Sequence, residues 1–376
     1  MMDKFEDLRP YYESEISPAM QRIADSSYLP VMAKFIFPDK EVAEVRDLLL
    51  KIKTIDEFQF QVMYYFNKTV VEQTIGEFTC SGIEQLDLNK SYLFISNHRD
   101  IVLDSSLMQY LFYENGLRTT EITFGSNLMS SQLVVDIGKS NKMFKVVRGG
   151  SIRDFYKNSM HLSEYIRYTI TEKKESIWIA QRNGRTKDGS DATDQGIIKM
   201  FCMSNTDHAV HSADELNIVP VAVSYGVEPC DIFKTRELYL SRNGKAYVKK
   251  EGEDVQSILT GITQYKGNVH FSICKPICRE ELDFIAKNYP NEFHKKIALL
   301  IDERIYANYK LHNNNYIAHD IRSGKDIYKS CYSAEEKERF IDRKKQMLEQ
   351  IDGNKEILES IFLGIYANPV DKSEMK

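Results

Sequence analysis

A histidine at the end of an apolar run is the first residue of this chain whose setting indicates chemistry. Residues 93–95 have the pattern of a short buried strand, His98 follows in a turn, and residues 105–113 have a helical pattern. Turns at the ends of strands often display catalytic and binding groups. A histidine in such a turn can act as a general base near neutral pH, and a carboxylate behind it can fix its tautomer.

Two other interpretations of His98 compete with catalysis. A single histidine after a strand is commonly a capping or hydrogen-bonding residue. In addition, His98-Arg99-Asp100 matches the first three residues of a protein-kinase catalytic loop. The kinase loop requires an asparagine five residues after its aspartate, where this chain has Ser105, and the sequence has no glycine-rich phosphate loop. The sequence therefore excludes a kinase.

Three further segments follow His98 in a fixed order. An apolar strand runs into an arginine at residues 144–151, a second strand leads into a turn with two arginines at residues 177–186, and a third strand at residues 218–224 has a central proline. Together with Asn97-His98 and Asp104, these segments resemble the four motifs of the glycerophospholipid acyltransferases. That family acylates glycerol 3-phosphate and lysophosphatidic acid. The resemblance covers roughly residues 80–280.

The resemblance implies transfer of an acyl group from a thioester to a hydroxyl group. Such a reaction needs a base for the hydroxyl proton and donors for the oxyanion, but neither a metal nor a bound cofactor. His98 would be the base and Asp104 the acid that orients it, with coenzyme A or acyl carrier protein as the donor thioester. Arginines bind phosphate in bidentate fashion. The expected substrate-binding residues are Asn97, Arg99, Arg148, Gly149, Arg182, Asn183, Gly184 and Arg185.

This chain departs from the family pattern in three places. Five residues separate His98 from Asp104 instead of four, so Asp100 is an alternative orienting acid; we favour Asp104 because it opens the following helix. Asn183 stands where the family has glutamate, and the register of Arg185 differs. The main alternative function is therefore a catalytically weak relative that binds lipid or acyl donor without turnover. A hydrolase is disfavoured because the sequence has no Gly-x-Ser-x-Gly nucleophile motif.

Composition sets the broad class of the protein. The 376 residues are 42% hydrophobic and 28% charged, which is typical of a globular chain. The 50 basic and 55 acidic residues give a net charge of −5, which argues against nucleic-acid binding. Basic residues are dense from Lys139 to Arg153. That cluster fits anionic lipid, an acidic carrier protein or simply a solvated charged face.

Spacing of cysteine and histidine residues favours neither disulfides nor a metal site. The six cysteines are scattered, as expected of free thiols in a reducing compartment. His208 and His211 have no matching cysteine or acid nearby, so we expect no metal. The chain shows no signal-peptide pattern and no apolar run near the ~20 residues of a spanning helix. We expect a cytoplasmic protein whose membrane association, if any, is peripheral at the inner face.

The chain divides into three expected parts. Residues 1–78 form a helical N-terminal segment that includes an apolar stretch at 28–38, which suits burial or a lipid contact. Residues 79–280 form an α/β core with a mixed, largely parallel sheet, because strand and helix patterns alternate there. Residues 281–376 form a helical C-terminal segment. Strands are expected near 92–96, 120–125, 144–148, 176–180, 218–224 and 268–274, and C-terminal helices at 293–309 and 334–365, joined through the polar residues 313–315.

Overall fold

A mixed sheet forms the centre of the molecule in the computed structural model, which describes residues 4–205, 209–244 and 247–374. Its strands lie in the order β1-β7-β6-β2-β5-β3-β4, and every neighbouring pair is parallel except β6 and β7. The sheet confirms the predicted fold class. The strands are β1 (Phe78–Ser81), β2 (Leu93–Ser96), β3 (Glu121–Gly125), β4 (Met143–Val146), β5 (Ile177–Ala180), β6 (Ile218–Tyr225) and β7 (Val269–Ile273).

Strand β2 lies at the middle of this sheet, between β5 and β6. All four of its residues are buried, as are all eight residues of β6. Continuous apolar runs of this kind are typical of parallel strands that are covered on both faces. Because β2, β3, β4, β5 and β6 point the same way, the segments that follow them all leave from one edge, called here the carboxyl edge of the sheet.

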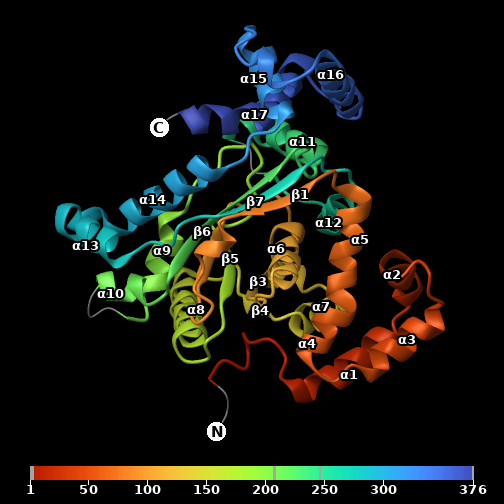
Figure 1. Ribbon diagram of the computed structural model, residues 1–376, viewed down its shortest axis with the longest axis vertical. Helices are drawn as coiled ribbons and strands as arrows, with labels where there is room; N and C mark the ends of the chain where they lie inside the picture. Colours follow the sequence, from red (N-terminus) through yellow and green to blue (C-terminus); the bar gives the residue numbers. More distant parts are fainter. Residues whose placement is uncertain (1–3, 206–208, 245–246, 375–376) are drawn as a thin grey trace.

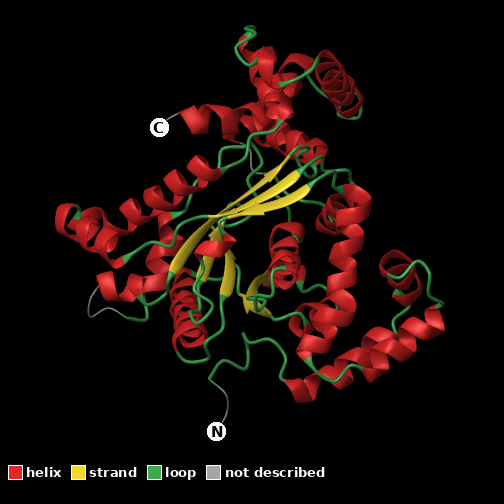
Figure 2. Cartoon of the chain, viewed as in Figure 1, coloured by secondary structure: helices red, strands yellow, loops and turns green. Residues whose placement is uncertain are grey.

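Helices cover both faces of the sheet (Figure 2). One face packs against α5 (Tyr64–Thr74), α6 (Leu103–Glu114) and α12 (Glu253–Thr263). The other packs against α8 (Ile152–Thr171), α9 (Gln195–Cys202), α10 (Ala209–Asp214), α13 (Arg279–Asn288) and α14 (Phe293–Asn308). Two separate apolar clusters therefore hold the sheet, one on each side, as in other α/β proteins.

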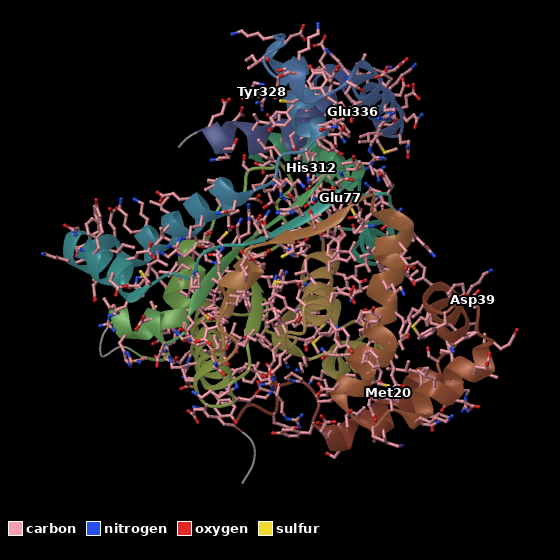
Figure 3. All side chains as sticks on the ribbon, viewed as in Figure 1. Met20, Asp39, Glu77, His312, Tyr328 and Glu336 are labelled. Atoms are coloured by element: carbon pink, nitrogen blue, oxygen red, sulfur yellow. The ribbon has the colours of Figure 1, made fainter. Side chains whose placement is uncertain are left out.

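The N-terminal segment is helical and lies beside the sheet (Figure 1). It contains α1 (Glu13–Ala24), α2 (Leu29–Ile36), α3 (Val42–Lys51), α4 (Ile55–Phe58) and the π-helical turn η1 (Gln59–Met63), and it shares an apolar cluster with α7 (Gln132–Ser140). Met20 on α1 and Asp39 after α2 mark it in Figure 3. In the 28–38 stretch, Leu29 and Ala33 are buried whereas Val31 is exposed, so α2 uses one side for packing.

The C-terminal helices form a layer over one end of the sheet (Figure 1). They are α15 (Asn313–Ser323), α16 (Ala334–Leu348) and α17 (Lys355–Glu374), and α11 (Asp231–Ser241), from earlier in the chain, packs with them. Figure 3 shows Tyr328 and Glu336 within this layer, and His312 between it and the sheet. By contrast, α13 and α14 pack on the sheet itself. The residues expected to form one helical C-terminal segment thus belong to three apolar clusters.

Two expectations for this part of the chain are wrong. Residues 313–315 do not join helices but begin α15, because the Asn315 side chain accepts a hydrogen bond from the His312 backbone N–H at 2.7 Å and caps the helix. The helix expected at 334–365 is two helices, α16 and α17. The helix is interrupted between them at Gly353, which passes the Tyr239 ring so closely that a Cβ on this residue would lie 2.5 Å from the ring.

Candidate active site

His98 lies in the turn that joins β2 to α6, at the carboxyl edge of the sheet. Its Nδ1 is 2.9 Å from Oδ2 of Asp104, in the first turn of α6. The ring also packs edge-on against Trp178 of β5, with 5.8 Å between ring centroids. The side chain is 13% exposed, so one side of the ring remains open to solvent.

Asp104 receives hydrogen bonds at both of its oxygens although it is fully buried. Oδ2 accepts from the backbone N–H groups of Arg99 and Asp100, at 2.6 and 2.9 Å, in addition to His98. Oδ1 accepts from the Tyr225 hydroxyl at 2.7 Å. Burial alone would raise the pKa of Asp104, but the hydrogen bond and charge of His98 and the hydroxyl of Tyr225 lower it. Asp104 is therefore an ionised acceptor.

The ionised state of Asp104 decides the tautomer of His98. A carboxylate only accepts hydrogen bonds, so Nδ1 of His98 carries the proton and donates it to Asp104. Nε2 of a neutral ring then keeps its lone pair. Among the described residues, none makes a hydrogen bond to this Nε2. The turn thus presents a basic nitrogen whose lone pair is open to a substrate.

Asp100 does not contact the His98 ring. Its Oδ1 accepts from the backbone N–H groups of Val102 and Leu103, both at 2.9 Å, so Asp100 caps the start of α6. Its Oδ2 is buried without a hydrogen bond. Burial, followed by the negative charge of Asp104, raises the pKa of Asp100. The two acids of the turn therefore have separate structural tasks.

The segment after β5 folds back over the His98 turn. The Thr186 N–H donates to the His98 carbonyl at 2.7 Å, and the Gln181 N–H donates to the Ser96 carbonyl at 2.8 Å. Gly184 has a positive φ of 77°, which allows the chain to reverse between these two contacts. This segment carries the predicted residues Arg182, Asn183 and Arg185. Its hydrogen bond to the His98 carbonyl holds the backbone of these residues close to the His98 turn.

These three side chains have different surroundings. Asn183 is exposed and Arg182 is half-buried. Arg185 is turned toward the interior, and its Nη1 is buried without a hydrogen bond. Burial raises the pKa values of Asp100 and Cys230, and the charge of Arg185 opposes that rise in both. Of the set, Asn183 is the one most accessible from solvent.

Arg148 reaches the same edge from β4. Its backbone N–H donates to Ser126 Oγ at 3.1 Å. Its guanidinium lies over Gly125 at the end of β3, where a Cβ would be 3.1 Å from Nε of Arg148. Burial lowers the pKa of Arg148, and the nearby charge of Asp254 opposes that effect. The following Gly149 is exposed, with a positive φ of 84°. Arg148 is thus a cation at the carboxyl edge, just after β4, the strand beside β3.

The side chains of Asn97 and Arg99 point into the protein. Asn97 bridges β2 to β6, because its Oδ1 accepts from the Val223 N–H at 2.7 Å and its Nδ2 donates to the Val223 carbonyl at 2.9 Å. Arg99 is 1% exposed and pairs with Asp191 at 2.6 Å and with Glu228 at 3.2 Å. In this placement both residues brace the turn, and neither side chain is free to contact a bound substrate.

Lys234 completes the buried charge group around Arg99. Its Nζ donates to Glu228 Oε1 at 2.6 Å and to the Arg99 carbonyl at 2.7 Å. Two cations and two carboxylates thus neutralise one another beneath the turn, which is how buried charges are tolerated. Asp191, Glu228 and Lys234 were not predicted from the sequence, because no local pattern connects residues so far apart in the chain.

Tyr225 was not predicted from the sequence either. It is the last residue of β6, one position beyond the segment that resembles the fourth motif. The only signal for its contact with Asp104 is that β6 lies beside β2, which the order of strands along the chain does not reveal. Burial and the charge of Asp104 hold the pKa of Tyr225 well above its ordinary value, so its hydroxyl remains a donor.

Helix α12 closes one side of the turn. Gly261 on this helix lies so close to Asp100 that a Cβ would be 2.2 Å from Oδ2. Ser257, one turn earlier, is buried, and its carbonyl accepts from Cys230 Sγ at 3.2 Å. The small residues of α12 therefore face the His98 turn and allow the helix to approach it.

Neither a metal site nor a nearby cavity adds to the site. No group of three or more metal-ligating side chains occurs among the described residues, which exclude His208. A cavity of about 710 Å³ is lined by residues such as Thr119, Lys142 and Glu175, which precede β3, β4 and β5. It lies at the opposite edge of the sheet from His98 and is not part of the candidate site.

A buried carboxylate that orients a histidine at the end of a central parallel strand is the arrangement of a general base in an α/β enzyme. The family comparison agrees with that class. Residues 77–224 match the family model described as Acyltransferase, a segment that runs from β1 to β6 and includes the whole His98 turn. This segment of the chain is therefore similar to the acyltransferase family.

Comparison with individual proteins adds little. No curated protein matches this chain. Among solved structures, the 1-acyl-sn-glycerophosphate (LPA) acyltransferase PlsC from Thermotoga maritima is 11% identical, with 77% of this chain and 94% of that chain covered and a TM-score of 0.38. A similarity at this level supports no conclusion about the fold or substrate of this chain.

Proposed function

We propose that this enzyme transfers a fatty acyl group from an acyl thioester to a hydroxyl group of a glycerol-phosphate-type or other lipid acceptor, with His98 as the general base. The observation that carries the proposal is the 2.9 Å hydrogen bond between His98 and the buried Asp104, inside the segment that matches the acyltransferase family. The donor is a coenzyme A or acyl carrier protein thioester, as the family resemblance implies.

The reaction follows from the state of the two side chains. Nε2 of His98 takes the proton of the acceptor hydroxyl while that oxygen attacks the thioester carbonyl. A carbon–oxygen bond forms, the carbon–sulfur bond breaks, and the proton passes from His98 to the departing thiolate. Asp104 stays ionised and stabilises the imidazolium through its hydrogen bond to Nδ1. The dyad therefore needs neither a metal nor an oxidant.

The phosphate of the acceptor would bind to arginines at the carboxyl edge. Arg148 is the strongest candidate because its guanidinium is displayed there over Gly125. Arg182 and Arg185 come from the segment that folds onto His98, and Gly149, Asn183 and Gly184 lie beside them in sequence. If the acceptor carries a phosphate, Arg148→Gln should raise the KM for the acceptor far more than the KM for the donor.

The test is product analysis by mass spectrometry after incubation with an acyl thioester and a panel of hydroxyl acceptors, including glycerol 3-phosphate and lysophosphatidic acid. Thioester consumption should depend on the acceptor, and a new ester should form. His98→Ala should keep the fold and reduce turnover by at least ~100-fold. A folded His98→Ala variant with near-normal turnover would contradict the assignment of the base.

Asn183 supports a second candidate, a relative that binds lipid or acyl donor with little turnover. It replaces the glutamate of the family pattern and is exposed, so the site lacks one negative charge beside its arginines. Under this candidate, the panel yields no ester while the acyl thioester still binds. If activity is found, Asn183→Glu should shift it toward glycerol 3-phosphate or lysophosphatidic acid.

Among the described residues, no helix has both the length and the apolar composition required to cross a bilayer. We propose a cytoplasmic enzyme that meets lipid substrates from the inner face of the membrane.

A further inference from the structure

The start of α8 projects from the molecule. Residues 151–157 are all exposed, and the first two turns of the helix carry three large apolar side chains, Ile152, Phe155 and Tyr156. Ile152 is 91% exposed and Phe155 is 69% exposed. The spacing of three and four residues places all three on one stripe of the helix. A stripe that packs on nothing in a folded chain indicates a contact with something outside it.

Helix α12 also carries apolar side chains on its outward side. Its small residues, Ser257 and Gly261, are buried, whereas Val255 and Leu259 are exposed by more than half. Val248, shortly before the helix, is also strongly exposed. A helix on the surface of a soluble protein ordinarily turns its apolar residues inward. The outward apolar stripe of α12 is therefore a second unexplained surface.

Both surfaces lie at the carboxyl edge of the sheet, where the candidate site is. Strand β4 ends at Val146 on the carboxyl edge, so α8 starts there, at the edge that holds His98. Helix α12 carries both Asp254, whose charge acts on Arg148, and Gly261, which lies against Asp100. The start of α8 thus lies at the edge of the sheet that holds His98, close to Arg148 in the chain, and α12 lies against the His98 turn itself.

Charge near α8 is predominantly basic. Residues 145–157 contain Lys145, Arg148, Arg153 and Lys157, against one acid, Asp154. That acid is occupied, because its carboxylate accepts from the backbone N–H and hydroxyl of Ser151 and caps α8. The start of α12 is mixed, with Lys249 paired to Asp254 at 2.5 Å and Glu251 and Lys250 exposed.

We infer that the exposed side chains Ile152, Phe155 and Tyr156 of α8 and Val248, Val255 and Leu259 of α12 form a docking surface for an anionic lipid bilayer. Apolar side chains that project beside lysine and arginine match the layered chemistry of a bilayer, whose phosphates lie above its acyl chains. Two separate helices present this chemistry, which suits an extended flat surface. The inference rests on the lipid acceptor in the proposed function, because a docked bilayer would deliver that acceptor beside His98.

The test is co-sedimentation of the full chain with vesicles of phosphatidylcholine alone and of phosphatidylcholine with phosphatidylglycerol. The unmodified protein should bind the anionic vesicles at least tenfold better than the neutral ones. The double variant Ile152→Ser/Phe155→Ser should lose about tenfold or more of that binding. Arg153→Gln/Lys157→Gln should lose about fivefold for each charge removed, and only on the anionic vesicles.

A matched control comes from the opposite edge of the sheet. Leu88 precedes β2 and Phe284 follows β7, and they are 75% and 61% exposed. Leu88→Ser/Phe284→Ser should bind vesicles like the unmodified protein. Equal loss in this control, equal binding to both vesicle types, or no vesicle binding by the unmodified protein would overturn the inference. Capture of an acidic acyl carrier protein through α8, without vesicle binding, would overturn it as well.

The outcome is separable from that of the proposed function. His98→Ala should bind vesicles normally, because His98 lies in the turn and not on the docking surface. If the unmodified protein binds vesicles but has no activity, the docking surface is supported and the acyl transfer is contradicted. If it turns over substrate but does not bind vesicles, the acyl transfer is supported and the docking surface is contradicted. Thermal unfolding of each variant shows that the fold is retained.

Discussion

Asp104 organises the candidate site through the hydrogen bonds that it accepts. One carboxylate joins the His98 ring, two backbone N–H groups of the same turn and the hydroxyl of Tyr225. Hydrogen bonds to an ionised group are stronger than those between neutral groups. Asp104 therefore fixes the shape of the turn and the orientation of the ring at the same time.

The two acids of the turn should differ in what they contribute to turnover. Asp104→Asn keeps the volume but removes the charge, and its amide can present a donor to Nδ1, which favours the wrong tautomer of His98. We expect a loss of at least ~100-fold in kcat. Asp100→Asn should cost less than about tenfold, because Asn also caps helices. Steady-state kinetics on both folded variants decides between them, and the reverse ranking would assign the orienting role to Asp100.

Tyr225 should act as a positioning residue for the dyad. Tyr225→Phe removes the only hydrogen bond to Oδ1 of Asp104 among the described residues, which leaves the carboxylate less stabilised and more attractive to the imidazolium. The acid limb of the pH profile of kcat/KM should therefore move to higher pH, by about half a unit to one unit. A variant that loses stability without any shift of this limb would show a structural role alone.

At the scale of elements, α12 can lie against the His98 turn only because it has glycine at position 261. The helix contributes little to the apolar cluster on its side of the sheet. Its half-buried Ile262 is the one residue of α12 in that cluster among the described residues. Its close approach brings Ser257 to Cys230 and Gly261 to Asp100. The wall of the site is thus a helix whose position depends on one missing Cβ.

Gly261→Ala sets two effects against each other. Replacing glycine in a helix ordinarily stabilises a protein by about 0.5–1 kcal/mol. Here the added Cβ would lie 2.2 Å from the buried Oδ2 of Asp100, and such overpacking costs about 1–3 kcal/mol. We expect the clash to win, so the melting temperature and the turnover should both fall.

The control for this substitution lies in α17. Gly364 is also helical, and a Cβ added at this position would be 3.8 Å from its nearest neighbour, an atom of the Asn368 side chain. Gly364→Ala should therefore raise the melting temperature and leave turnover unchanged. Stabilisation by both substitutions in thermal unfolding would mean that α12 is free to move away from Asp100.

At the scale of the whole molecule, the charges beneath the turn connect it to the C-terminal helices. Glu228, which pairs with Arg99, donates its backbone N–H to the Tyr366 hydroxyl of α17 at 3.2 Å. Tyr366 in turn donates to Asp231 at 2.7 Å, and Asp231 also pairs with Arg343 of α16 at 2.9 Å. The C-terminal layer therefore supports the same loop that braces His98, although it supplies no group to the dyad.

Asp302 should make stability depend on pH. It lies on α14 and accepts from the N–H and hydroxyl of Thr193 at 2.8 and 2.6 Å, which ties α14 to the loop carrying Asp191. Burial raises the pKa of Asp302 from 3.8 to about 6. Below about pH 3 the group is protonated in both the folded and the unfolded state. As pH rises from about 4 to 6 the unfolded chain loses this proton first, so stability falls and then levels off.

Asp302→Asn removes that fall, because the amide oxygen still accepts from Thr193 and never ionises. The variant should be more stable than the unmodified protein by about 1–3 kcal/mol above about pH 7 and equal to it near about pH 3. Thermal unfolding across this range measures the difference. Glu303→Gln, at the exposed neighbouring position, should show no such pH dependence. A constant difference at all pH values would contradict the assignment to Asp302.

The sequence by itself determined the features that depend on neighbouring residues. Apolar runs of four to eight residues located β2, β3, β4, β5, β6 and β7, and their alternation with helices indicated the mixed α/β sheet. The order of Asn97-His98, Asp104 and the three later motifs indicated the acyltransferase family, which the family match supports. The position of Asp104 at the start of α6 was also sufficient to favour it over Asp100 as the partner of His98.

Only the tertiary structure decided which distant residues meet at the turn. Tyr225, Asp191, Glu228 and Gly261 are all distant from His98 in the chain, and their contacts depend on β6 lying beside β2 and on α12 lying against the His98 turn. It also showed that Arg99, a candidate by sequence, is buried in ion pairs, since a charged side chain has no sequence pattern that distinguishes a partner inside the protein from a ligand outside it. Strand order and burial are properties of the whole chain, and they cannot be read from local spacing.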